Sequence, residues 1–561
     1  MKRIYENMKK IYIVFLATLL FFINVTAKAQ QHNEIFDNKD FEILKNIEIF
    51  TTIYKLVNQN YVDDVQPGTI IKTGIDAMLR SLDPYTVYIP EANIEDYRML
   101  TLGHYGGIGS TIHYRNGSVY ISDPYKGFPA DIAGLKPGDR ITKINGENTS
   151  GKNVEDVSAM LKGQAGTVIE MEVERRGETN PIAVKIIRKE IEINNVTYSG
   201  MLNKHIGYIR LDGFTQDASE EVKTAFLKLK REGMDALVFD LRYNGGGLMN
   251  EAVKIVNLFY PKGYAVVSTK GKIEDKNVTF HTTQDPQDID IPIVFLTSRG
   301  TASASEIVSG ALQDYDRAVI VGERTFGKGL VQNILPLVYN SQIKITISKY
   351  YIPSGRCVQA IDYFNRDNEG KANKIPDSLR TAYKTKGGRT VYDGDGIEPD
   401  IEVEEASYSD VSGSLLSKFI IFDFATDYRS KHSEMGSIDD FEISDELYGE
   451  FKEYASKAGY DYTLPEEEIL KELENIVKED SLKVTVAAPL QKLKEAVLQT
   501  KAGDLDRHAD EIKRILREEI ISRYYYQEGR AQAELMGDKT VARAIKVLED
   551  KNEYSTILKG R

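Results

Sequence analysis

Apolar runs alternate with helical patterns through the middle of the chain, and this alternation limits the folds that the chain can adopt. The runs predict strands at Ile206–Leu211, Ala236–Leu241, Ile293–Leu296 and Val319–Glu323. Amphipathic spacing between the first two predicts a helix at Glu220–Arg231. Strands that alternate with helices indicate an α/β core, in which functional loops follow the ends of strands. We expect this core over residues 191–405.

Two short motifs that follow strands of this core carry the residue types of nucleophilic catalysis. Ser303 begins a helical stretch after one strand, and Lys328 lies between two glycines after the next. A serine hydroxyl attacks well only if a base takes its proton. An amine can do so where a water-poor site disfavours the charged ammonium form. The two residues are therefore a candidate nucleophile and general base.

A structural interpretation of the serine motif stays open, because Ser303 and Glu306 have the spacing of a helix capping box. Capping and catalysis are compatible. The helix N-terminus favours a nearby negative charge, and its N–H groups can hold a developing oxyanion. Thr301 and Ser305 are rival hydroxyls in the same motif.

Lys328 taken alone is typical of a surface lysine. The flanking glycines distinguish it, because they let the backbone pass close to other segments. Lys328 is also distinguished from a surface lysine by three apolar neighbours, which are Phe326, Leu330 and Val331.

Cysteine and histidine indicate no further chemistry. Cys357 is the only cysteine, so no internal disulfide forms, and no base-bearing motif surrounds it. The seven histidines are scattered, which argues against a zinc site, and we expect no metal and no cofactor. A histidine triad is disfavoured because no histidine lies near the serine or lysine motif in sequence, although triads assemble in space.

Residues 103–190 have a different pattern, with a glycine cluster, short strand signals and an Asn145-Gly146 turn. A helix is predicted at Val154–Leu161 and an alternating strand at Val168–Arg175. Together they resemble a PDZ domain. The resemblance implies that an extended peptide binds by strand addition and that a backbone loop grips its terminal carboxylate. The matching loop residues are Gly106, Gly107, Ile108 and Gly109, for which a plain turn before a strand is the alternative.

Behind this domain, several motifs occur in an order that resembles the carboxyl-terminal processing (tail-specific) proteases. They are A-S-A-S-E-I around Ser303, F-G-K-G around Lys328, Gln332, a D-L-R-x-N-x-G-G string from Asp240, and G-I-x-P-D at Gly396–Asp400. The resemblance covers roughly residues 40–405.

The resemblance implies a serine–lysine dyad and assigns roles to residues at the motif positions. Ser303 would be the nucleophile, Lys328 the base and Gln332 the residue that orients the lysine. The oxyanion hole would consist of Gly245 or Gly246 together with the N–H of Ala304. The family implies an endopeptidase that acts on polypeptides with a free C-terminus, bound by the PDZ domain. A catalytically inactive PDZ adaptor or chaperone in the periplasm is the alternative.

The N-terminus has the pattern of an export signal. A basic start precedes the apolar run Ile11–Val25, and Ala27-Lys28-Ala29 provides small residues for a signal peptidase. The run of about 15 residues is short for a membrane span, which needs roughly 20. We expect a cleaved signal peptide over residues 1–29 and a periplasmic protein. Retention of the segment would associate the protein with the inner membrane.

The remaining segments are predicted to be helical. They are an N-terminal region, residues 33–102, and a charged C-terminal region, residues 406–561, to which no activity is assigned. The net charge of −13 argues against nucleic acid as a partner. A homo-oligomer and an adaptor lipoprotein both stay open as partners. The predicted fold class is α/β multidomain, with a PDZ domain, an α/β serine-protease core and helical terminal regions.

Overall fold

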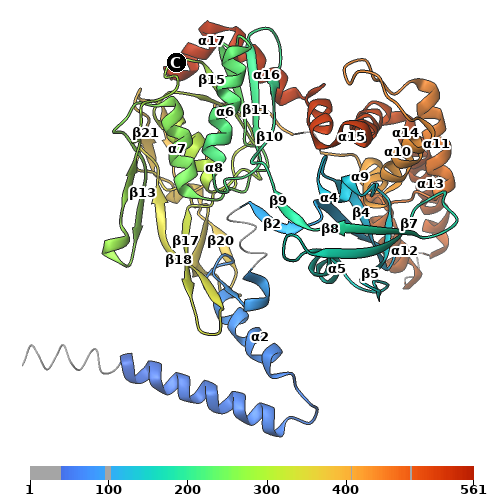
Figure 1. Cartoon of the computed structure of the whole chain (residues 1–561), viewed down its shortest axis with the longest axis horizontal. Helices are drawn as coiled ribbons and strands as arrows, with labels where there is room; N and C mark the ends of the chain where they lie inside the picture. Colours follow the sequence, from blue (N-terminus) through green and yellow to red (C-terminus); the bar gives the residue numbers. More distant parts are fainter. Residues whose placement is uncertain (1–38, 95–102, 406, 480–482, 561) are drawn as a thin grey trace, which may run out of the picture. The chain divides into compact units, whose positions relative to one another are not determined.

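The computed structural model describes residues 39–94, 103–405, 407–479 and 483–560 (Figure 1). The expected signal peptide, residues 1–29, lies outside these ranges. The chain divides into two units, of which the first ends at Tyr88 and the second begins at Ile89. Within the described ranges, no helix is both long enough and apolar enough to cross a bilayer.

The first unit contains a helix over residues 39–60 and the helix α2 (Pro67–Arg80), as the helical spacing predicts. The Tyr54 hydroxyl donates to the Pro67 carbonyl oxygen over 3.0 Å and links the two helices. Large apolar side chains of the first helix, including Ile47 and Ile53, are more than half exposed.

The PDZ region of the second unit is a curved antiparallel sheet with two helices, α4 (Pro129–Ile132) and α5 (Val154–Leu161). The strands follow the order β3–β4–β5–β7–β8, so β3 lies at the edge of the sheet. Their bounds are β3 Ser110–Arg115, β4 Ser118–Pro124, β5 Arg140–Ile144, β7 Val168–Glu174 and β8 Ile182–Ile187, and β6 (Glu147–Asn148) pairs with β5. The short strands β2 (His104–Gly107) and β9 (Lys189–Glu192) pair with each other where this region joins the core.

The α/β core expected over residues 191–405 is built on a sheet with the order β10–β11–β12–β15–β16–β23. The strands are β10 Val196–Met201, β11 Ile206–Leu211, β12 Ala236–Asp240, β15 Ile293–Thr297, β16 Val319–Gly322 and β23 Ile401–Glu402. β10 is antiparallel to β11, and the other neighbours are parallel. Because successive side chains of a strand point to opposite faces, Leu237 and Phe239 join one hydrophobic core while Val238 joins the other.

Helices cover both faces of this sheet. The helices α6 (Ala218–Arg231), α7 (Met249–Phe259) and α8 (Ala304–Asp314) contribute to the core on one face. The last two helices of the chain, α16 (Lys539–Glu549) and α17 (Lys551–Leu558), cover the other face (Figure 1). The end of the predicted C-terminal region therefore completes the α/β core, which no local sequence pattern indicated.

A second sheet adjoins the core and contributes to the site. It contains β13 (Ala265–Gly271), β14 (Thr279–His281) and the hairpin of β17 (Leu330–Pro336) and β18 (Gln342–Tyr351). Two small hairpins lie between β18 and β23 in sequence. They are β19 (Ile361–Arg366) with β20 (Ala372–Lys374) and β21 (Ala382–Lys384) with β22 (Thr390–Tyr392).

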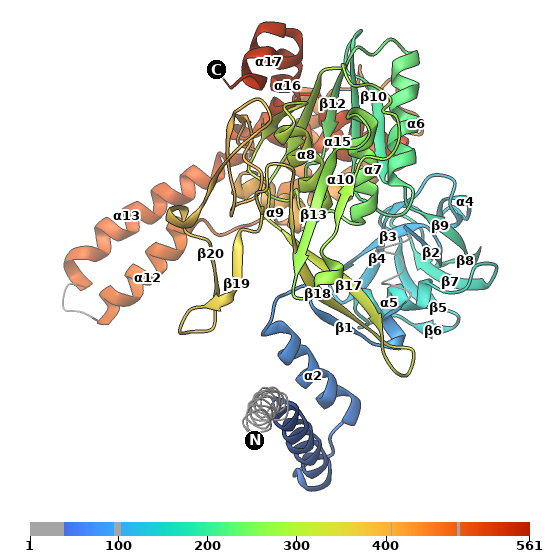
Figure 2. The same ribbon diagram turned by 90° about the vertical axis from the view of Figure 1, so that its left-hand side faces the viewer.

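The C-terminal region is helical, as predicted, and has its own hydrophobic core. Its helices are α9 Asp410–Ser417, α10 Ile420–Lys431, α11 Asp445–Ala458, α12 Pro465–Glu479, α13 Lys483–Ala502, α14 Asp504–Arg507 and α15 Ala509–Leu535. Figure 2 shows α12 and α13 as a pair of helices that extends away from the neighbouring helices.

Candidate active site

Ser303 lies at a sharp turn between β15 and α8. Its backbone has φ 57° and ψ −114°, an uncommon conformation for a residue with a side chain. The conformation places the residue at the N-cap of α8, as the capping-box spacing predicts. The helix dipole therefore points its positive end toward the hydroxyl.

Burial separates Ser303 from its two rivals. Ser303 is half-buried, whereas Thr301 and Ser305 are fully buried. The Thr301 hydroxyl donates to the Leu241 carbonyl oxygen over 2.8 Å, and the Ser305 hydroxyl donates to the Asn244 carbonyl oxygen over 3.0 Å. Both rival hydroxyls are buried and bonded to backbone carbonyl oxygens. Ser303 is therefore the hydroxyl of this motif that a substrate can reach.

The buried carboxylate of Glu306 joins the serine turn to the lysine loop. Its Oε2 accepts the N–H of Ser303 over 2.8 Å and the N–H of Lys328 over 2.9 Å. Its Oε1 accepts the N–H of Gly327 over 2.8 Å and the hydroxyl of Thr325 over 2.5 Å. Burial raises the pKa of Glu306, while these four donors favour the ionised form. The sequence indicated Glu306 only as part of a helix cap.

The two glycines beside Lys328 are required by close packing. A Cβ on Gly327, whose φ is +83°, would lie 2.5 Å from the Ala360 Cβ, and a Cβ on Gly329 would lie 2.8 Å from the Gln359 nitrogen. Real side chains do not approach so closely, so only glycine fits at both positions. The packing brings the Lys328 backbone against the chain segment that contains Gln359 and Ala360.

The predicted catalytic and oxyanion residues line one cavity of about 460 Å³. They are Ser303, Lys328, Gln332, Gly245, Gly246 and Ala304. Leu330 and Val331 line it too, as expected for a water-poor site, whereas Phe326 is 46% exposed and is not among the lining residues. The Gln332 amide donates to the Thr346 hydroxyl over 3.2 Å. The cavity also contains Lys344, a second lysine that the motifs did not indicate.

Asn244 holds the glycine loop beside the serine turn. Its carbonyl oxygen accepts the N–H of Ala302 over 3.0 Å, and its side-chain nitrogen donates to the Leu211 carbonyl oxygen over 2.7 Å. Its side-chain oxygen accepts the N–H of Gly246 over 2.9 Å. The Gly246 N–H is thus already used inside the loop, an observation that favours Gly245 over Gly246 as a donor to an oxyanion.

Gly246→Ala is expected to lower the rate of peptide cleavage by about 10²-fold, because it displaces the loop that carries the Gly245 N–H, and the loss of one oxyanion-hole donor has an effect of this size. At φ +97°, a Cβ would lie 2.7 Å from the Ser303 Cβ and 2.9 Å from the Ala304 nitrogen, so the loop must move away from the serine. Gly263→Ala is the matched control, because Gly263 has φ +92° with no atom within 4 Å of the added Cβ. The Gly263→Ala protein should lose about 1 kcal/mol of stability and keep its activity. Equal loss in both variants would contradict this role for the loop.

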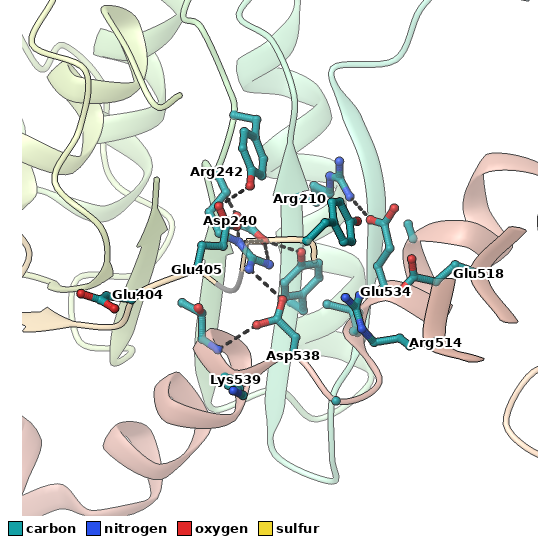
Figure 3. A pocket seen from close by; sticks show the side chains of 17 residues that line it. Arg210, Asp240, Arg242, Glu404, Glu405, Arg514, Glu518, Glu534, Asp538 and Lys539 are labelled. Atoms are coloured by element: carbon teal, nitrogen blue, oxygen red, sulfur yellow. Dashed lines mark hydrogen bonds and ion pairs between the residues drawn. The ribbon is translucent and has the colours of Figure 1, made fainter. Parts of the chain in front are cut away.

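A cluster of ion pairs lies at the end of β12, just before the glycine loop in sequence (Figure 3). The Arg242 guanidinium pairs with Asp240 over 2.6 Å and with Asp538 over 2.7 Å, and the Tyr208 hydroxyl donates to Asp240 over 2.7 Å. Burial opposes ionisation of Asp240, but the neighbouring Arg242 charge holds its pKa below its ordinary value. Asp538 also caps α16 through the N–H groups of Thr540 and Val541. The C-terminal helices therefore contact the D-L-R motif directly.

The predicted carboxylate loop of the PDZ region is split between a strand and a turn. Gly106 and Gly107 end β2, where they pair with β9, and Ile108 is buried in the PDZ core. Gly109 has φ +72° and immediately precedes β3. The loop thus leads into the edge strand, which contacts α5.

The structure favours neither a cysteine nucleophile nor a histidine triad. Burial raises the pKa of the Cys357 thiol, which disfavours the nucleophilic thiolate. No histidine is among the residues that line the cavity. Among the described residues, no group of three or more His, Cys, Asp or Glu is arranged to hold a metal ion.

Comparison with known families assigns a description to each region. Residues 205–364 match Peptidase family S41, and residues 120–175 match the PDZ domain. Residues 411–548 match "Probable PDZ-protease, C-terminal helical domain", and residues 16–92 match "Activating protease CtpB N-terminal domain".

A single similar protein matches more of the chain than any one of these family descriptions does. The chain is 35% identical over 353 residues to a carboxy-terminal-processing protease of Bartonella bacilliformis, covering 62% of this chain and 80% of that protein. The chain belongs to the carboxy-terminal-processing serine proteases of family S41. This assignment confirms the predicted family and fold class.

Two further proteins are similar to this chain. A probable CtpA-like serine protease of Staphylococcus aureus is 34% identical over 352 residues, covering 61% of this chain and 70% of that protein. The solved structure of a photosystem II D1 C-terminal processing protease is 26% identical and covers 63% of this chain and 92% of that chain. Its TM-score is 0.34, too low to support a structural argument.

Proposed function

We propose that this serine protease cleaves peptide bonds with a Ser303–Lys328 dyad and selects its substrates by their C-terminal tails. The observation that carries the dyad is that the serine turn and the lysine loop line one cavity and share the Glu306 carboxylate. A shared buried anchor limits how far the two loops can move apart. Such a constraint favours a nucleophile and a base that act together.

The proposed reaction is acyl transfer. The Ser303 oxygen attacks the carbonyl carbon of the substrate while neutral Lys328 accepts the hydroxyl proton. The C–N bond then breaks, and Lys328 returns the proton to the leaving amine. Water, deprotonated by the same lysine, attacks the acyl-enzyme and regenerates Ser303. The first N–H of α8, that of Ala304, has no acceptor within the helix, so it can stabilise the oxyanion together with Gly245.

Tail selection is assigned to the PDZ region. The loop Gly106–Gly109 leads into the edge strand β3, and α5 packs beside that strand. An extended peptide can therefore add to β3 and place its terminal carboxylate at the N–H groups of the loop. Export to the periplasm, inferred from residues 1–29, would bring the protease to other exported proteins.

Amidation of a substrate's C-terminus is expected to reduce kcat/KM by about 10-fold or more, because the amide removes the charge that the PDZ loop binds. Two peptides that differ only in this group would be compared with the full-length protein. Ser303→Ala protein provides the binding control, since it should bind the free acid more tightly than the amide without consuming either. Equal cleavage and equal affinity for both peptides would refute tail selection.

A further inference from the structure

Asp538 brings a carboxylate from near the end of the chain to the segment that precedes the glycine loop. It lies immediately before α16, and its Oδ2 pairs with the Arg242 Nη1 over 2.7 Å (Figure 3). Only 15% of the Asp538 side chain and 14% of the Arg242 side chain are exposed, so dissolved salt screens this ion pair weakly. The pair therefore joins the C-terminal helices to the residues just before Gly245.

The residues around Arg242 lie between two separate cavities. Arg242 and Tyr243 line a cavity of about 350 Å³ together with Asp538. Gly245 and Gly246, which follow closely in sequence, line the catalytic cavity instead. Because one short segment of backbone contributes to both walls, a shift of Arg242 in the first cavity can be passed to the glycines beside the nucleophile.

The backbone between the two cavities has a conformation that its surroundings must hold. Tyr243 has φ 59°, which is uncommon for a residue with a side chain and persists only where neighbouring contacts fix it. Its N–H donates to the Ser298 hydroxyl over 2.9 Å. The Arg242 N–H donates to the Asp240 carboxylate over 2.9 Å. These bonds hold the backbone of the turn, while the guanidinium of Arg242 is held by carboxylates.

The two oxygens of the Asp538 carboxylate have separate partners. Oδ1 accepts the N–H of Thr540 over 2.8 Å and that of Val541 over 3.0 Å, and so caps α16. Oδ2 faces Arg242, whose Nε and Nη2 donate to Asp240 over 3.0 Å and 2.6 Å. The helix is itself fixed, because Val541 is buried against the core sheet. The carboxylate is therefore a rigid anchor for the third nitrogen of the guanidinium.

We propose that Asp538 is a positioning residue for peptide cleavage, which holds Arg242 and so keeps the Gly245 N–H at the oxyanion position beside Ser303. The proposal rests on the proposed function, which assigns that N–H to the oxyanion hole. A loop that shifts would stabilise the transition state less and still bind the substrate. The C-terminal helices thereby take part in catalysis without touching the substrate.

Asp538→Asn tests this role because it removes the charge and keeps the helix cap. Asparagine caps helices as well as aspartate does, so its oxygen can still accept from α16, but its NH₂ group then faces the Arg242 guanidinium. In the full-length protein we expect kcat to fall about 10-fold with little change in KM, because a displaced donor acts mainly on the transition state.

Asp550→Asn is the matched control for this variant. The Asp550 side chain caps α17 through the N–H groups of Asn552 and Glu553, as Asp538 caps α16. It is not among the residues that line either cavity. The control should therefore keep the wild-type kcat, and an equal loss in both variants would assign the effect to helix capping and overturn the proposal.

A peptide boronic acid provides a readout that a loss of stability alone would not change. Its boron bonds to the serine oxygen, and one of its own oxygens then occupies the oxyanion position. The affinity per active site, with sites counted by complete fluorophosphonate labelling, should fall about 10-fold in Asp538→Asn protein. The affinity for the product peptide should stay unchanged. A variant that is merely less stable would have fewer active sites, each with wild-type affinity.

Asp538→Ser is a second variant that keeps a capping oxygen and removes the carboxylate, and it should show the same losses. Wild-type kcat and wild-type boronate affinity per active site in either folded variant would overturn the proposed role of Asp538. The proposed function is tested separately by Ser303→Ala. If that protein cleaves the peptide or binds the boronate as the wild type does, the proposed function fails, and the role of Asp538 fails with it.

Discussion

Ser303→Ala is expected to reduce peptide cleavage by about 10³-fold or more, because no other hydroxyl of the motif can replace the nucleophile. Thr301 and Ser305 are fully buried and donate to backbone carbonyl groups. The measurement is the rate of peptide cleavage by purified protein, with labelling by a serine-reactive fluorophosphonate as a second readout. Both signals should disappear together.

Ser309→Ala provides the control on the same helix. Ser309 is fully buried, and its hydroxyl donates to the Ser305 carbonyl oxygen over 2.8 Å. Its loss should cost about 1 kcal/mol of stability and leave the nucleophile in place. Undiminished cleavage by Ser303→Ala protein would remove the basis of the proposed mechanism.

Lys328→Arg is expected to be as inactive as Lys328→Ala, with rates reduced by about 10³-fold or more. An arginine keeps the positive charge, but its guanidinium stays protonated and cannot accept the serine proton. A merely electrostatic role for Lys328 would instead be rescued by arginine. The comparison of the two variants in a peptide-cleavage assay therefore separates a base from a fixed cation.

Lys344 is the rival base, because it lines the same cavity from β18. It lies opposite Ile334 in the hairpin and lacks the flanking glycines and the Glu306 anchor of the Lys328 loop. Lys344→Arg should keep most of the activity. An inactive Lys344→Arg combined with an active Lys328→Arg would transfer the role of base to Lys344.

Much of the local architecture could be predicted because it depends on neighbours in sequence. The strand at Ile206–Leu211 and the helix at Val154–Leu161 match the structure residue for residue. The N-cap position of Ser303 followed from its spacing to Glu306. The roles of Ser303, Lys328, Gln332 and the glycines stay predictions, although the structure brings these residues to one cavity.

The partners of these residues could not be predicted, because they are distant in sequence. Nothing near Arg242 indicated that Asp538 would pair with it. Likewise, the helical pattern of α16 and α17 did not indicate that they cover the protease sheet. Amphipathic helices bury their apolar side against whatever surface the fold provides, and sequence spacing does not name that surface.

The sequence by itself determined the main strands of the core sheet, several helices, the family and the residue types available for catalysis, since these follow from short-range spacing and motif order. Only the tertiary structure decided that one buried carboxylate, Glu306, holds the serine and lysine loops together, and that another, Asp538, pairs with Arg242 before the glycine loop. The physical reason is that hydrogen bonds and ion pairs between separate segments exist only after the chain has folded.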